Sequence, residues 1–87
     1  MEPELSRSSY LIMGILRSKN ALDKIRALTI YEIQEMEKLS KPSTIYKKVK
    51  EMKALGFVQE GLRTGKAKTY FLTETGSSKL PNRKEGL

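Results

Sequence analysis

Residues 41–72 read KPSTIYKKVKEMKALGFVQEGLRTGKAKTYFL, and this stretch decides the fold. Pro42 suits the first turn of a helix, where a backbone N–H has no partner, and Ser40 is available as the cap. Gly56 suits the left-handed residue that ends a helix. The apolar side chains that recur at helical spacing between them are Ile45, Val49 and Met52. The stretch therefore predicts a helix with one buried face, followed by a separate element.

Two strand-like segments follow this helix, residues 57–62 and 68–72. They are separated by residues 63–67, RTGKA, whose glycine and polar side chains are typical of a turn. The sequence thus predicts a hairpin with a basic tip. An ordinary solvated turn explains such a tip when it stands alone, but here it follows a basic helix.

Two more helices are predicted upstream. The first runs from Ser6 to about Lys19 or Asn20, with Ser6, Ser8 or Ser9 as its cap and an apolar stripe on Leu11, Ile12, Ile15 and Leu16. Tyr10 and Met13 widen that stripe, for contact either with the core or with a second subunit. The connector, residues 20–28, contains a possible short strand at Ala27 and Leu28.

The second upstream helix begins at a capping-box pattern. Thr29 to Glu32 read TIYE, in which the Thr and Glu side chains bond reciprocally to early backbone N–H groups. Ile30, Ile33 and Met36, with Tyr31 beside them, predict a helix to about Lys38. A tight turn at Leu39 and Ser40 then joins it to the next helix, which is a helix-turn-helix arrangement.

Positive charge is concentrated in one part of the chain. Residues 1–40 carry six basic and six acidic side chains, whereas residues 41–68 carry eight basic and two acidic ones. That segment therefore holds +6 of the chain's net +7. A neutral half joined to a strongly basic half indicates a phosphate-binding face on a neutral scaffold.

Composition bounds the chemistry of the chain. It has no Cys and no His, so we expect no thiolate or imidazole metal site, no cysteine nucleophile and no Ser-His relay. No cofactor loop is recognisable, and we expect a protein that is not an enzyme. No apolar run approaches the length of a membrane span and no basic secretory start is present, so we expect a cytoplasmic, nucleoid-associated protein.

The 87 residues are expected to form one domain over residues 1–80, with a loose arm at residues 1–5 and a disordered tail at residues 81–87. Its predicted class is α+β, mostly helical. The predicted core consists of Leu11, Ile15, Leu16, Leu28, Ile33, Ile45, Val49, Met52, Leu55, Phe57 and Leu72.

Two motifs resemble the winged helix-turn-helix regulators of the PadR and MarR type. Ser43-Thr44-Ile45-Tyr46, followed by Val49, Met52 and Gly56-Phe57-Val58, is similar to that family's S/T-x-L-Y-x-x-L-x-x-L-x-x-x-G-L-V run. Residues 70–76, YFLTETG, resemble its Y-x-L-T-x-x-G exit from the wing. The resemblance covers residues 29–76 and implies a three-helix core with a β-hairpin wing.

The resemblance departs at the C-terminus, where PadR-type regulators usually carry long helices that build the dimer. If this chain dimerises, we expect the first helix or residues 74–80 to carry the contact. Small one-domain relatives of this kind occur among plasmid and viral proteins, including PadR-like proteins that coat plasmid partition sites.

Together these patterns predict a double-stranded DNA-binding face on the third helix and the wing. The residues expected to contact DNA are Ser43, Thr44, Tyr46, Lys47, Lys48, Lys50, Lys53, Arg63, Lys66 and Lys68. The favoured hypothesis is a sequence-specific repressor bound as a homodimer to an inverted repeat. The second is a plasmid or viral partition or architectural protein that coats DNA and contacts partner proteins. The third is a winged-helix module that binds an acidic protein.

Overall fold

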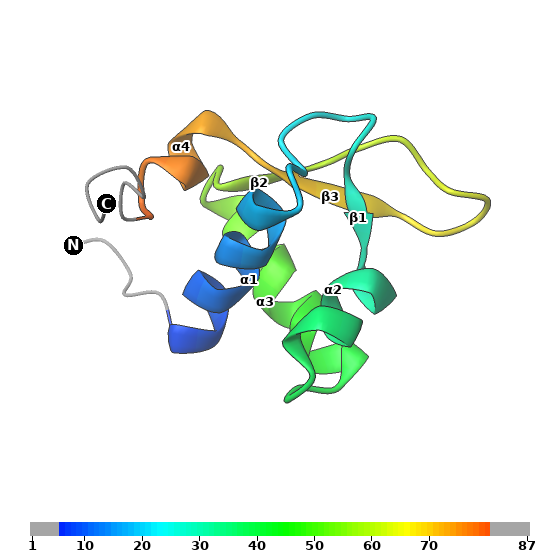
Figure 1. The fold of residues 1–87 in the computed structure, drawn as a ribbon, viewed down its shortest axis with the longest axis horizontal. Helices are drawn as coiled ribbons and strands as arrows, with labels where there is room; N and C mark the ends of the chain where they lie inside the picture. Colours follow the sequence, from blue (N-terminus) through cyan, green and yellow to red (C-terminus); the bar gives the residue numbers. More distant parts are fainter. Residues whose placement is uncertain (1–5, 81–87) are drawn as a thin grey trace.

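The computed structural model describes residues 6–80, so the predicted arm and tail lie outside the described residues. A three-stranded antiparallel sheet of order β1-β3-β2 lies along one side of three helices, and a short fourth helix follows the last strand (Figure 1). The elements are α1 (Arg7–Ser18), β1 (Leu28–Thr29), α2 (Ile30–Glu37), α3 (Pro42–Ala54), β2 (Val58–Glu60), β3 (Thr69–Leu72) and α4 (Glu74–Ser77).

The helix starts follow the caps that the sequence indicated. Ser6 caps α1, where its hydroxyl accepts the N–H of Ser9 at 3.2 Å. The capping box of α2 is complete, because the Glu32 N–H donates to the Thr29 hydroxyl and the Thr29 N–H donates to the Glu32 carboxylate. These two predictions are confirmed, and the bonds satisfy orphan N–H groups at both helix starts.

The turn between α2 and α3 is held by a buried carboxylate. Glu37 is 7% exposed, and it accepts the N–H groups of Leu39 at 2.8 Å and Ser40 at 2.7 Å. The Ser40 hydroxyl donates to its other oxygen at 2.9 Å. Burial acts to raise the pKa of Glu37, but these hydrogen bonds to the charged form outweigh it and leave the pKa below the ordinary value.

The predicted cap of α3 was therefore wrong. The Ser40 hydroxyl donates its hydrogen bond to Glu37. The N-cap residue of α3 is Lys41, which makes no side-chain capping bond. Pro42 does occupy the first turn of α3, as predicted. At the other end, Gly56 has a φ of 82°, the left-handed conformation expected of a helix terminator.

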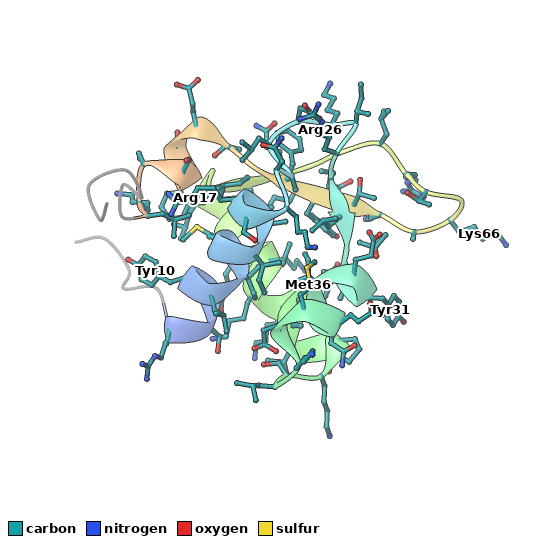
Figure 2. The ribbon with its side chains drawn as sticks, in the orientation of Figure 1. Tyr10, Arg17, Arg26, Tyr31, Met36 and Lys66 are labelled. Carbon is teal, nitrogen blue, oxygen red and sulfur yellow. The ribbon has the colours of Figure 1, made fainter. Side chains whose placement is uncertain are left out.

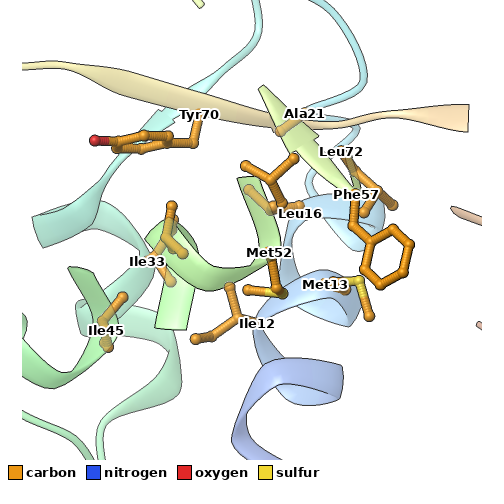
Figure 3. Close-up of a cluster of buried hydrophobic side chains, with 12 residues drawn as sticks. Ile12, Met13, Leu16, Ala21, Ile33, Ile45, Met52, Phe57, Tyr70 and Leu72 are labelled. Carbon is orange, nitrogen blue, oxygen red and sulfur yellow. The ribbon is translucent and has the colours of Figure 1, made fainter. Parts of the chain in front are cut away.

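The core lies between the three helices and the helix-facing side of the sheet. Figure 3 shows side chains of α1, α3 and β3 meeting there. Seven predicted core residues are buried, namely Leu16, Ile33, Ile45, Val49, Met52, Phe57 and Leu72. Ile15 and Leu28 are half-buried, and Leu28 packs against the cluster.

Two predicted core residues were wrong. Leu11 is 45% exposed, because the buried face of α1 is turned by about one residue from the expected stripe. Leu55 is 36% exposed, because it is the C-cap residue of α3 and no longer lies on the inner face of that helix. The inner face of α1 consists of Ser9, Ile12, Met13 and Leu16.

The hairpin is present, with shorter strands than predicted. Val58, Gln59 and Glu60 of β2 pair with Leu72, Phe71 and Tyr70 of β3, and the predicted short strand near Leu28 pairs on the other side of β3. Gly61 allows the connector to approach the base of the hairpin, since a Cβ there would lie 2.5 Å from the Ala27 Cβ. A helix-turn-helix core with this hairpin is a winged helix, which confirms the predicted fold class.

Replacing Val49 by Ala should lower the free energy of unfolding by about 2 kcal/mol, because Val49 is fully buried and truncation leaves a cavity. Leu55→Ala is the control: it removes more atoms, but from a partly exposed site, so its effect should be smaller. Urea denaturation of both variants measures the difference. Equal losses would contradict the inner face assigned to α3.

Candidate nucleic-acid interface

The outward face of α3 carries most of the candidate residues. Ser43, Thr44, Lys47 and Lys50 are exposed, and Lys48 is half-buried at the edge of this face. Small hydroxyl side chains occupy the first turn, where they allow close approach to a groove, and the lysines follow. The opposite face of the helix is fully buried, so α3 presents this basic face to solvent in a fixed orientation.

The expected DNA contacts of the wing lie in two places, at the tip and at the base of the hairpin. Arg63 and Lys66 are exposed near the tip, and Figure 2 shows Lys66 at the far end of the hairpin, away from the helices. Gly65 takes a φ of 62° in the turn, which Thr64 and Ala67 close with reciprocal backbone hydrogen bonds of 3.0 Å. Lys68 lies lower, at the base of the wing.

Where α3 meets the base of the wing, three of the charged side chains form one group. The Lys53 ammonium donates to the Glu60 carboxylate at 2.5 Å, and the Lys68 ammonium lies 4.0 Å from the same oxygen. The hydrogen bond with Glu60 raises the pKa of Lys53, and the same bond lowers the pKa of Glu60. Lys53 and Lys68, two of the residues predicted to contact DNA, therefore interact with Glu60, an acidic side chain of the protein itself.

Tyr31 is a residue that sequence reasoning placed differently. It is 69% exposed in the first turn of α2, where Figure 2 shows it projecting from the helix, rather than lying beside an apolar face. It lines a shallow hollow with Lys41, Pro42, Ser43 and Tyr46. The sequence could have predicted this exposure. The capping box places Thr29 at the N-cap, and if Ile33 points inward, the helical residue two positions before it points outward.

The structure thus joins the candidates into one region, except at the wing tip. Tyr46 of α3 shares a second hollow with Tyr31, Lys68 and Tyr70, which links α2, α3 and the base of the wing. Arg63 and Lys66 extend from this region on the hairpin. A basic helix flanked by a basic hairpin presents donors to phosphates over two separated positions, which is suited to a duplex.

Within residues 6–80, no three His, Cys, Asp or Glu side chains group closely enough to hold a metal ion. No helix among those residues is both long and apolar enough to cross a membrane.

Known proteins resemble this chain in fold and, more weakly, in sequence. No protein-family model matches it. The chain is 28% identical over 76 residues to the DNA-binding protein TubR of Clostridium botulinum C phage, a match that spans 87% of this chain and 93% of that protein. The structure of TubR from Bacillus megaterium pBM400 has a TM-score of 0.75 at 23% identity, covering 86% of this chain and 81% of that one. A zinc-responsive MarR family member, ZitR of Lactococcus lactis, has a TM-score of 0.69 at 19% identity, covering 90% of this chain and 50% of that one.

Lys47→Ala should weaken binding to a duplex selected from a random pool more than binding to a scrambled duplex. The loss of discrimination should be about tenfold or more, because Lys47 is exposed in the middle of α3, where we expect the helix to meet base edges. Lys66→Ala, at the wing tip, should weaken both by the same factor. Fluorescence anisotropy titrations measure all four affinities. A Lys66→Ala variant that loses only the selected duplex would contradict this division between α3 and the wing.

Proposed function

We propose that this protein binds double-stranded DNA through α3 and the wing, and that it coats plasmid or viral DNA as a partition or architectural protein. The contacts are assigned to the exposed face of α3 and to the wing, where the chain's excess positive charge is concentrated. Phosphate contacts from these lysines supply affinity, and the small residues at the start of α3 admit the helix to the major groove.

The observation that carries this proposal is the extent of the similarity. The chain matches 93% of the phage DNA-binding protein, but only 50% of the MarR family member. The similarity to the phage protein therefore extends over nearly its whole length, whereas the regulator shares only its winged-helix half. This favours the partition or architectural hypothesis over the repressor hypothesis, which the MarR-like fold still supports as the second candidate.

The proposal includes a homodimer formed through the outer face of α1. A groove beside this face is lined by apolar side chains of α1, the α2–α3 turn and the segment after α4, namely Tyr10, Leu11, Leu39 and Leu80, and by polar side chains that include Arg7, Arg17 and Lys79. Three of these are exposed in the single chain: Tyr10 by 42%, Leu11 by 45% and Leu39 by 86%. Burying such side chains against a second copy removes apolar surface from water and favours association.

Two further details of the groove fit a partner helix. A Cβ built at Gly14 meets nothing within 4 Å, so the backbone of α1 is open to close approach there. Arg17 lines the groove, and its Nε is buried without a hydrogen-bond partner among residues 6–80; a second copy's acceptor would satisfy this atom if the guanidinium turned outward. Figure 2 shows Tyr10 and Arg17 on the side of α1 that faces away from α2.

Leu11→Lys should convert the protein to a monomer, because it places a charge in the proposed dimer face while leaving the core intact. Ile25→Lys is the matched control, since Ile25 is 82% exposed in the connector, outside the groove. Sedimentation equilibrium measures the mass of each. A monomeric wild type, or a dimeric Leu11→Lys variant, would refute this interface.

Coating should appear as protection that spreads along the DNA as the protein concentration rises. DNase footprinting of the DNA flanking the protein's own gene, followed by electron microscopy of the complexes, measures this spread. A dimeric repressor would instead protect one bounded site, with half-sites about 10 base pairs apart or a multiple of that. If the wild-type protein binds no duplex even at low salt, both the coating hypothesis and the repressor hypothesis are overturned. That outcome would favour a winged-helix module that binds an acidic protein.

A further inference from the structure

Glu60 is one of two acidic side chains in the basic segment of residues 41–68, and it lies where α3 meets the base of the wing. It lies on β2 with its carboxylate 2.5 Å from the Lys53 ammonium of α3 and 4.0 Å from the Lys68 ammonium at the base of the wing. The side chains of both lysines remain nearly half exposed, at 46% and 45%, and that of Glu60 is 34% exposed. One carboxylate therefore engages two of the eight cations between residues 41 and 68.

The position of Glu60 follows from the strand. Val58 and Glu60 alternate with Gln59, so they share a face of the sheet, and Val58 is fully buried on the helix side. The Glu60 side chain therefore turns toward α3 instead of toward open solvent. On α3, Lys53 lies two turns after Tyr46, which shares the hollow with Lys68. The group thus belongs to the candidate interface itself.

An exposed ion pair of this kind contributes little to stability, since water screens it and ordering the side chains opposes it. Its effect on an anionic ligand is larger. A carboxylate held between two lysines occupies the place that a phosphate would take, and a phosphate must compete with it for both cations. The pair therefore acts against DNA binding at the junction of α3 and the wing.

We propose that Glu60 is a specificity-determining residue that suppresses binding to non-specific duplexes. The inference rests on the proposed DNA-binding function. Non-specific complexes depend almost wholly on phosphate contacts, so withholding two lysines weakens them most. In a specific complex the N-terminal end of α3 sets the register, and Lys53, at the other end of the helix, stays with Glu60.

Glu60→Gln removes the charge while keeping the size of the side chain. We expect its affinity for a random-sequence duplex to rise on the order of tenfold, with the slope of log K against log salt steeper by about 1 to 2 per protomer. Affinity for a duplex selected from a random pool should rise less, so the ratio of the two affinities falls. Anisotropy titrations over several salt concentrations measure both.

Glu51→Gln is the matched control. It makes the same change of charge on α3, but Glu51 is exposed and forms no ion pair among residues 6–80. Its gain in affinity should be smaller, and the ratio between duplexes should stay closer to the wild-type value. Equal effects of the two variants would show that only net charge matters, and would overturn the assignment to Glu60.

A double-mutant cycle tests the partner. Lys53→Gln should cost more affinity for the random-sequence duplex in the Glu60→Gln background than in the wild-type background, because the released lysine then contacts phosphate. Equal costs in the two backgrounds, or a loss of affinity in Glu60→Gln itself, would overturn the inference.

Separate measurements test whether each variant folds and whether the proposed DNA-binding function holds. Circular dichroism melting checks each variant, and if Glu60→Gln is unfolded, Glu60→Thr removes the same charge with a residue favourable in strands. If the wild type binds duplexes and Glu60→Gln behaves as Glu51→Gln, only this inference fails. If the wild type binds no duplex, the proposed function fails with it.

Discussion

The structure depends on the buried carboxylate that closes the turn between α2 and α3. Glu37 accepts three hydrogen bonds from Leu39 and Ser40, so two backbone N–H groups that the turn would leave unpaired are satisfied. Because Lys38 already takes the left-handed conformation that ends α2, the chain reverses within a few residues. The direction of α3, and with it the direction of every candidate contact on that helix, is set by this turn.

Local signals in the sequence predicted the elements near this turn well. A capping box, a proline in a first turn and a glycine at a helix end each act through a few neighbouring residues, and the structure has all three. Along α3, charged and apolar residues alternate at helical spacing, so the inner face was unambiguous. Along α1, apolar residues occur on nearly every side, and periodicity could not distinguish Leu11 from Met13. Only packing against α2, α3 and the sheet decides which of them is buried.

The candidate site shows the same division between local and long-range information. Clustering of charge is a property of the sequence, and it pointed to α3 and the wing. The engagement of Lys53 and Lys68 by Glu60 depends on how α3 is packed against β2, which no spacing rule gives. Ser40 likewise has the side chain and position of a helix cap, but its hydroxyl donates to Glu37 instead. A polar side chain with several possible partners is the residue type that sequence reasoning places least well.

Segregation of charge along the chain also suits the proposed function, in which one small domain binds both DNA and a second copy of itself. Residues 1–40, which include α1 and α2, carry no net charge, so most of the chain's excess positive charge lies outside the segment that contains α1. In the proposed complex, the +6 of residues 41–68 faces the duplex, whose phosphates neutralise it. Once it is neutralised, neighbouring copies on one DNA molecule no longer repel one another through that face. A protein that coats DNA needs both properties, and the order of the elements along this chain agrees with the proposed function.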